Sequence, residues 1–199
     1  MSRSGQPIAP PRRRVLHWLG AGVGSAALAS CGGGVVLVWG EFPASAASTP
    51  AGKNPRPTVR IVASGLSRPW ALVFLPDGRM LVTERTGALR IVTADGRIGA
   101  PIAGVPAVDA RGQGGLLDVA LDPAFASNRR IYLSYAEPGS GADAGRNGTA
   151  VARAVLSADG TQLTEVQVIF RQTPKIDSTA HFGSRLAFAP DGTLFVTLG

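Results

Sequence analysis

The 199-residue sequence predicts an all-β fold and, within that class, a β-propeller. Three observations lead to this prediction. Apolar runs of four to eight residues, rich in Val, Ile, Leu, Phe and Tyr, follow one another from residue 58 onward, and no run has the length of an ordinary helix. Turn-forming residues separate the runs. The pattern of strand and turn also repeats along the chain.

The expected strands share this length and composition. They are residues 58–63, 71–75, 80–84, 89–92, 116–121, 131–136, 149–156, 166–171, 186–189 and 194–198. Two turns between them, Leu75-Pro76-Asp77-Gly78 and Ala189-Pro190-Asp191-Gly192, place Pro where φ must be fixed and Gly where the backbone turns left-handed. We expect a tight antiparallel hairpin at each turn.

A repeat relates the two hairpins. Residues 70–78 match residues 186–192 in pattern, and residues 117–123 form a looser copy between them. The copies start about 45 to 70 residues apart, and a helix-free unit of that length with four strands is typical of a propeller blade, with a β-sandwich as the alternative. We therefore expect residues 58–199 to form a partial propeller of two near-complete blades and the first hairpin of a third. The chain would then be the front portion of a longer protein, truncated at Gly199 and inactive by itself.

Charge and composition exclude several functions. The formal charge is +7, but residues 1–31 hold four Arg and no acidic residue, so the remainder carries 16 basic against 13 acidic side chains. These basic residues are spread singly, without the clusters that track a phosphate backbone, so we expect no nucleic-acid partner. One Cys and two His are too few for a disulfide scaffold or a zinc site built from Cys and His.

Residues 1–31 have the pattern of an export signal. Arg12, Arg13 and Arg14 precede a weakly apolar run over residues 15–29, in the manner of a twin-arginine signal. Leu28-Ala29-Ser30-Cys31 resembles a bacterial lipobox, in which Cys31 would be lipidated and become the first residue of the mature protein.

Cleavage after Ala44-Ser45-Ala46 is the alternative. Residues 32–57 are rich in Ser, Thr, Pro and Ala towards their end and are expected to form a flexible tether. Either route predicts a periplasmic or otherwise extracytoplasmic protein, and the first adds a lipid anchor to the membrane.

Two loops are the candidates for chemistry. In a propeller, the residues that precede each inner strand gather near the axis on one face. Gly112-Gln113-Gly114-Gly115 precedes one inner strand and His181-Phe182-Gly183-Ser184-Arg185 precedes another, so Gln113 and His181 are expected at equivalent positions of successive blades. By residue type alone, a loop histidine such as His181 is more often an ordinary surface or packed residue than a catalytic one. Asp77, Asp122 and Asp191 are expected to cap turns.

Several blocks of sequence resemble one family, the soluble quinoprotein glucose/sorbosone dehydrogenases, and within it the periplasmic aldose sugar dehydrogenases. The resemblance covers residues 59–199. The blocks are Ser67-Arg68-Pro69-Trp70-Ala71-Leu72, Gly112 to Pro123, Asn128 to Tyr135, Ile169-Phe170-Arg171-Gln172 and His181 to Leu186.

The resemblance implies a six-bladed propeller that oxidises aldose sugars with pyrroloquinoline quinone (PQQ) and calcium (Ca²⁺) and passes electrons to an external acceptor. It also implies that His181 is the general base and that Gln113 helps to hold the sugar. The calcium ligands and the residues that grip PQQ are expected mainly in later blades, so no cofactor-binding or metal-binding residue is assigned. Ala180 stands where glucose-specific relatives carry a carboxylate, which implies a broader or different sugar range. The competing hypothesis is a non-catalytic extracytoplasmic propeller that binds a sugar or a protein partner.

Overall fold

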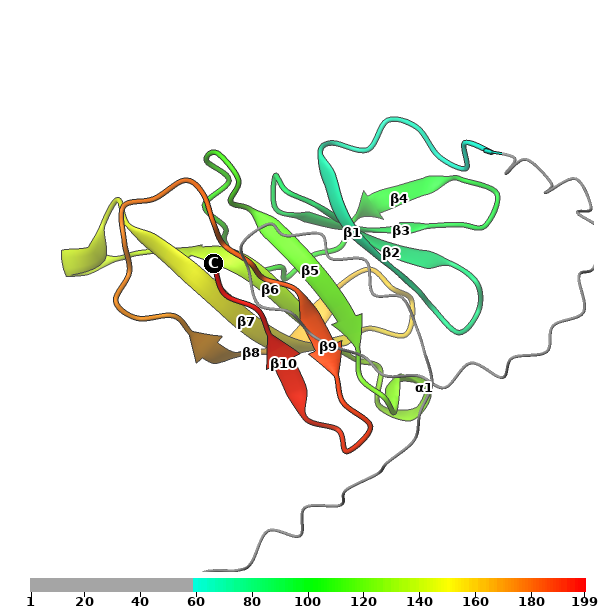
Figure 1. Ribbon diagram of the computed structural model, residues 1–199. Helices are drawn as coiled ribbons and strands as arrows, with labels where there is room; N and C mark the ends of the chain where they lie inside the picture. The colour runs from blue at the N-terminus through cyan, green and yellow to red at the C-terminus, as the bar shows by residue number, and fades with distance from the viewer. Residues whose placement is uncertain (1–58) are drawn as a thin grey trace, which may run out of the picture. The chain divides into compact units, whose positions relative to one another are not determined.

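The computed structural model describes residues 59–199, which form two four-stranded antiparallel sheets and a two-stranded hairpin (Figure 1). The predicted export signal at residues 1–31, with Cys31, and the predicted tether at residues 32–57 lie outside the described residues. Among the residues described, the longest α-helix has four residues, so no helix there could cross a membrane. The all-β prediction is confirmed.

The first sheet is a meander of four strands in chain order. They are β1 (Pro69–Phe74), β2 (Met80–Glu84), β3 (Ala88–Val92) and β4 (Ile98–Pro101). The turn between β1 and β2 forms as predicted, because the Gly78 N–H donates to the Leu75 carbonyl over 2.9 Å and Gly78 has a φ of 83°.

The second sheet repeats this order and the hairpin begins a third copy. Its strands are β5 (Leu116–Leu121), β6 (Arg130–Pro138), β7 (Asn147–Leu156) and β8 (Leu163–Arg171), with α1 (Phe125–Asn128) between β5 and β6 and a short 3₁₀ turn (Gly141–Asp143) between β6 and β7. The hairpin pairs β9 (Leu186–Phe188) with β10 (Leu194–Val196), and its predicted turn closes where the Gly192 N–H donates to the Ala189 carbonyl over 2.9 Å.

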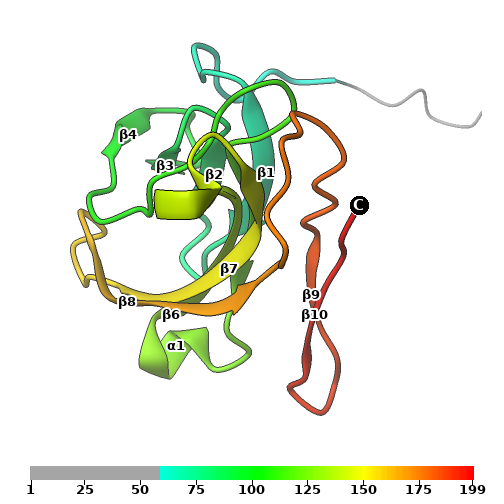
Figure 2. The ribbon, with the colours of Figure 1, turned by 90° about the vertical axis from the view of Figure 1, so that its left-hand side faces the viewer.

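The three sheets follow one another through their first strands. β5 contacts β1 and β2 of the first sheet, and it also contacts β9 of the hairpin. Figure 2 shows the β9–β10 hairpin alongside the second sheet. Successive four-stranded antiparallel meanders that contact one another through their first strands have the arrangement of propeller blades, whose first strands line the central axis. The propeller prediction is confirmed over the sandwich.

Apolar side chains from both sheets form one core. Leu81 and Leu89 of the first sheet lie in the same cluster as Leu116, Ile131 and Leu133 of the second, and all five are fully buried. Each such side chain stabilises the fold by roughly 1.5–3 kcal/mol relative to leaving it exposed. This shared core packs the first sheet against the second.

One strand prediction was wrong and one strand was not predicted. Residues 59–63 form no strand, because Val59 and Ile61 point to solvent while Ala63 packs on the cluster of Met80, Val82 and Val92. β4 was missed because its sequence, Ile-Gly-Ala-Pro, has little strand propensity and lies mostly exposed at a sheet edge.

Candidate functional site

A pocket of about 430 Å³ contains both side chains that the sequence singled out. Its lining combines aromatic and apolar side chains with an imidazole, an amide and a guanidinium. The lining residues are Trp70, Arg85, Gln113, Leu117, His181, Phe182, Gly183 and Gly199. They come from β1, the residue after β2, the loop before β5 and β5 itself, the loop before β9, and the segment after β10, so all three sheets contribute to the pocket.

Gln113 and His181 are in direct contact. The backbone N–H of His181 donates to the side-chain oxygen Oε1 of Gln113 over 3.0 Å. The Gln113 backbone N–H donates in turn to the Thr179 carbonyl over 2.6 Å. Two hydrogen bonds therefore join the loop before β5 to the loop before β9.

The two side chains are not at equivalent positions of their blades, contrary to the prediction. The N–H of Asp118 donates to the Ser134 hydroxyl in the second sheet, and the N–H of Arg185 donates to the Thr197 hydroxyl in the hairpin. These matching bonds align Asp118 with Arg185 and hence residue 113 with residue 180. His181 lies one residue further along, and a turn in the chain brings it to Gln113.

The His181 loop is anchored on its far side. Thr149 of β7 donates from its hydroxyl to the Phe182 carbonyl over 2.8 Å, and Ser134 of β6 donates to the Ser184 carbonyl over 2.6 Å. Both hydroxyls are buried. The loop therefore exposes the His181 imidazole while its backbone is tied to the second sheet.

Trp70 lines the pocket, and the guanidinium of Arg185 stacks on its ring. The guanidinium carbon of Arg185 lies 4.7 Å from the Trp70 ring centroid, a cation–π distance. Arg185 Nη1 donates to Asp118 Oδ1 over 3.0 Å, and the Leu186 N–H donates to Asp118 Oδ2 over 2.7 Å. The buried Asp118 carboxylate thus ties β9 to β5 and orients the residue that covers the tryptophan.

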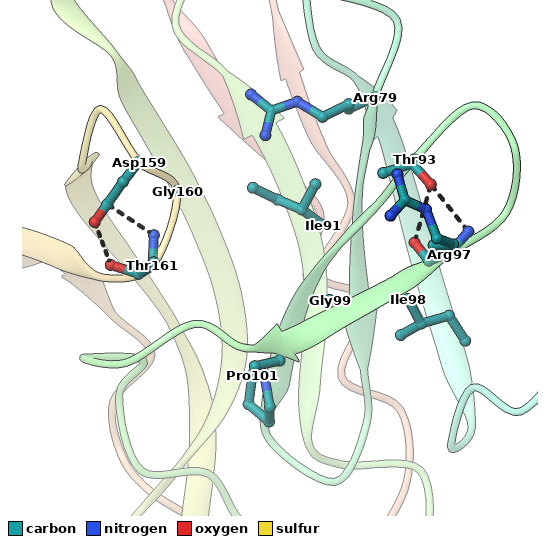
Figure 3. Close-up of a pocket in the computed structure, with 11 residues that line it drawn as sticks. Arg79, Ile91, Thr93, Arg97, Ile98, Gly99, Pro101, Asp159, Gly160 and Thr161 are labelled. Atoms are coloured by element: carbon teal, nitrogen blue, oxygen red, sulfur yellow. Dashed lines mark hydrogen bonds between the residues drawn. The ribbon is translucent and has the colours of Figure 1, made fainter.

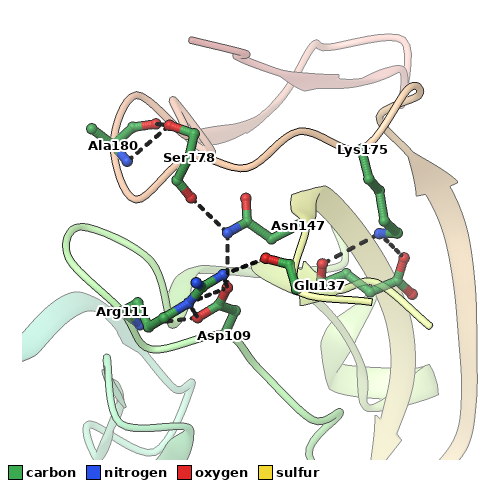
Figure 4. A network of polar contacts seen from close by, with 8 residues as sticks. Asp109, Arg111, Glu137, Asn147, Lys175, Ser178 and Ala180 are labelled. Atoms are coloured by element: carbon green, nitrogen blue, oxygen red, sulfur yellow. Dashed lines mark hydrogen bonds and ion pairs between the residues drawn. The ribbon is translucent and has the colours of Figure 1, made fainter. Parts of the chain in front are cut away.

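A polar network centred on Asn147 lies between the two loop segments and joins them (Figure 4). The side-chain amide of the buried Asn147 donates to Asp109 Oδ2 over 2.8 Å and to the Ser178 carbonyl over 2.6 Å. Asp109 precedes Gln113 in the loop before β5, and Ser178 precedes His181 in the loop before β9. Hydrogen bonds from Arg111, together with the bond from Asn147, overcome partial burial and hold the pKa of the Asp109 carboxyl well below its usual value.

A second ion-paired group lies beside this network. Glu137 accepts from Lys175 Nζ over 2.7 Å and from Arg171 Nε over 2.9 Å. Burial alone would raise the pKa of Glu137, but the two cations outweigh it and lower that pKa. Lys175 belongs to the segment between β8 and β9, so this pair also fixes the approach to His181.

Another pocket, of about 420 Å³, lies between the β3–β4 edge and the turn that joins β7 to β8 (Figure 3). Its two cationic residues are already paired. Arg79 Nη2 lies 2.6 Å from Asp77 Oδ2, and Arg97 Nε lies 3.3 Å from Asp95 Oδ2. We assign no chemistry to this pocket.

The carboxylates expected in turns do cap them. Asp77 accepts from the Arg79 N–H, Asp122 from the Ala124 N–H and Asp191 from the Thr193 N–H, over 2.9 to 3.1 Å. Within residues 59–199, no group of three or more His, Cys, Asp and Glu side chains is placed to hold a metal ion.

Arg85, Asp109 and Asn147 were not predicted from the sequence. Each acts through a partner about 30 residues or more away along the chain, such as Gly112 or Gly114 for Arg85 and Ser178 for Asn147. A single sequence holds no local signal for such long-range contacts.

The chain is similar to several known proteins over most of its described residues. The chain is 50% identical over 142 residues to the aldose sugar dehydrogenase YliI of Escherichia coli K12, a match that covers 71% of this chain and 38% of the relative. The solved structure of the soluble aldose sugar dehydrogenase from E. coli in the apo form matches with a TM-score of 0.65 at 50% identity, covering 70% of this chain and 40% of that one.

A second solved structure is the PQQ-bound form of aldose sugar dehydrogenase from Streptomyces coelicolor. It matches with a TM-score of 0.61 at 34% identity and covers 71% of this chain and 40% of that one. The chain thus spans about two fifths of the length of these relatives. Residues 66–199 match the family described as Glucose / Sorbosone dehydrogenase. The chain belongs to the glucose/sorbosone dehydrogenase family.

Proposed function

We propose that this chain supplies the substrate-facing loops of a sugar dehydrogenase that oxidises the anomeric carbon of aldoses to lactones, with PQQ as the hydride acceptor. The observation that carries the proposal is the direct contact of Gln113 with His181 in a pocket that also presents Trp70. Two relatives are named as aldose sugar dehydrogenases, and one of their structures holds PQQ.

His181 is the proposed general base. Its side chain is exposed at the pocket and makes no hydrogen bond to any of residues 59–199. A neutral imidazole carries one ring nitrogen that can accept a proton. That nitrogen would take the proton of the anomeric hydroxyl while the C1 hydrogen leaves as hydride, so that the C1–O1 bond becomes a carbonyl and the aldose becomes a lactone.

Gln113 is the proposed sugar contact. Its Oε1 is engaged by the His181 N–H, which leaves the two N–H donors of its amide for the oxygens of sugar hydroxyls. Trp70 and Phe182 offer apolar surface for the C–H faces of a pyranose ring. An amide cannot accept the proton as a base would, so Gln113 orients the sugar and His181 carries the proton.

The pocket offers residues that could contact a sugar, but none of its residues is assigned to PQQ binding. PQQ, when bound, supplies the two-electron acceptor, and the calcium that the family resemblance implies would polarise it. Arg85 is the cation among the lining residues, but it is engaged with the carbonyls of Gly112 and Gly114. We therefore assign neither the PQQ carboxylates nor calcium to a residue of this chain.

Ala180 supports a broad sugar range. Its methyl group offers no polar contact, and its backbone N–H donates to the Ser178 hydroxyl over 3.2 Å. A hydroxyl-binding carboxylate is therefore absent from position 180. We propose that several aldoses are accepted at comparable rates.

Dye reduction by the full-length protein tests the proposal. With PQQ and Ca²⁺ added, glucose, galactose and xylose should each reduce an artificial acceptor, and omission of PQQ should abolish the reaction. Binding of a sugar or protein partner without any PQQ-dependent dye reduction would instead support the non-catalytic propeller.

A further inference from the structure

We propose that Gln113 is a positioning residue for His181 and that this role is separate from its contact with the sugar. The catalytic consequence rests on the proposed function, but the contact itself can be measured without activity. Three observations lead to the inference: the bonds that Gln113 makes, the backbone conformation of His181 and the support behind Gln113.

The bonds of Gln113 hold the His181 segment at two points. Its side-chain Oε1 accepts from the His181 N–H over 3.0 Å, and its own N–H donates to the Thr179 carbonyl over 2.6 Å. One residue therefore fixes a donor and an acceptor that lie two positions apart. The second bond is a backbone bond that any residue except proline could make, whereas the first depends on the glutamine side chain, and a side chain that served only the sugar would not need it.

The conformation of His181 requires such a partner. Its φ is 61°, in the left-handed region that residues other than Gly seldom adopt. His181 is also exposed, so packing does not hold it there. Strained backbone of this kind persists where surrounding contacts fix it. Relaxation of φ would swing the imidazole away from its present direction. The bonds to the Phe182 and Ser184 carbonyls hold the residues after His181, and the Gln113 bond is the one that holds the His181 N–H itself.

Gln113 is itself fixed from the first sheet. Arg85, which follows β2, donates from Nε to the Gly114 carbonyl over 3.0 Å and from Nη2 to the Gly112 carbonyl. These carbonyls flank Gln113 on both sides. At Gly112, an added Cβ would lie 2.3 Å from the Thr179 carbonyl oxygen, so glycine is required for the two loops to approach this closely.

Two substitutions separate positioning from sugar binding. Gln113→Glu keeps an oxygen that can accept the His181 N–H but removes the amide donors, whereas Gln113→Ala removes both. Gln162→Ala is the matched control, because Gln162 is exposed outside the pocket and its side chain makes no hydrogen bond among residues 59–199.

Hydrogen exchange of the His181 backbone amide is the first measurement, made on the full-length protein. In the wild type and in Gln162→Ala, exchange should be at least about tenfold slower than in an unstructured chain. Gln113→Glu should keep most of this protection, and Gln113→Ala should lose it. Unprotected exchange in the wild type, or unchanged protection in Gln113→Ala, would overturn the proposal. Because unprotected exchange in the wild type alone overturns the proposal, the test does not depend on the folding of a variant.

Steady-state kinetics with PQQ and Ca²⁺ are the second measurement. Gln113→Ala should lower kcat by about 10-fold to 100-fold, since misplacing a base by about 1 Å has effects of this size, and should also raise KM. Gln113→Glu should recover most of kcat while KM stays high. Its carboxylate favours a protonated imidazole, so kcat is compared on the high-pH plateau. Wild-type kcat in Gln113→Ala with only KM changed would contradict positioning. Absence of sugar oxidation in the wild type would overturn the proposed function, while the exchange result would still decide the contact.

Discussion

The hydroxyl of Thr83 in β2 donates a 2.6 Å hydrogen bond to the carbonyl oxygen of Leu117 in β5, which joins the first sheet to the second. The Thr83 hydroxyl oxygen in turn accepts from the Ala71 N–H in β1 over 3.0 Å. Thr83 is fully buried, so both bonds are shielded from water. One hydroxyl thus bridges two strands of its own blade and the first strand of the next.

Ser134 repeats this arrangement one blade later. Its hydroxyl accepts from the Asp118 N–H over 2.9 Å and donates to the Ser184 carbonyl over 2.6 Å. The bridging hydroxyl is therefore a feature of the repeat, and it sets the spacing between the loops that carry Gln113 and His181.

Replacing Thr83 by Val should destabilise the protein. The substitution keeps the shape of the side chain but leaves the Ala71 N–H and the Leu117 carbonyl without their buried partner. We expect the free energy of unfolding in urea to fall by about 1 to 3 kcal/mol. The control is Thr164→Val, the same change at an exposed position where the hydroxyl lies 3.4 Å from the Val155 carbonyl. Equal losses in the two variants would contradict a bridging role.

Acid stability should depend on Asp109. Its folded-state pKa is lowered, first by the hydrogen bonds from Arg111, so between that pKa and the unfolded value of about 3.9 the unfolded chain binds more protons than the folded one. The stabilisation is therefore present above about pH 4 and is lost as the pH falls below it.

Asp109→Asn removes this linkage. The variant should be less stable at pH 7, and its free energy of unfolding should decline less steeply than that of the wild type from about pH 4 to pH 2. Asp191→Asn is the comparison, since Asp191 is exposed and bonds only to Thr193, and it should change the slope less. Identical slopes for the wild type and Asp109→Asn would refute the linkage.

The sequence predicts best those strands that consist of an uninterrupted run of strand-forming residues. β2 and β5 match their predicted bounds because each is a run of strand-forming, mostly buried residues. β4 was not predicted because its Gly, Ala and Pro adopt a strand only by pairing with β3 at the sheet edge. Residues 59–63 show the reverse, an apolar pattern that finds no partner strand among the residues described.

In the site as well, residues marked by a local sequence pattern were predictable and residues placed by distant contacts were not. Gln113 and His181 were predictable because glycine-rich loops before inner strands converge in a propeller. Their register was not, because nothing in the sequence marks that His181 lies one residue closer to its inner strand than Gln113 does. Asn147 reads in the sequence as the end of a loop, and its bridge between the two loops depends on contacts more than 30 residues distant.

Lipid attachment at Cys31 remains a prediction from the sequence. Mass spectrometry of the mature N-terminus should find a diacylglyceryl-modified Cys31, since the single cysteine ends a Leu-Ala-Ser triplet after a basic segment and an apolar run. Cys31→Ser should remove the modification without changing the folded domain. A mature protein with a free N-terminus near Ala47 would show ordinary signal cleavage instead.

Turnover of His181→Ala tests the central claim most directly. In the full-length protein with PQQ and Ca²⁺, the change should lower dye-linked aldose oxidation by about 100-fold to 10,000-fold, the contribution of a positioned general base. PQQ affinity, measured separately by absorbance, should stay close to the wild-type value because the base acts on the sugar proton. The exposed control Gln162→Ala should match the wild type in both measurements. Near wild-type turnover of His181→Ala with glucose, galactose and xylose would contradict the account and favour a propeller that only binds.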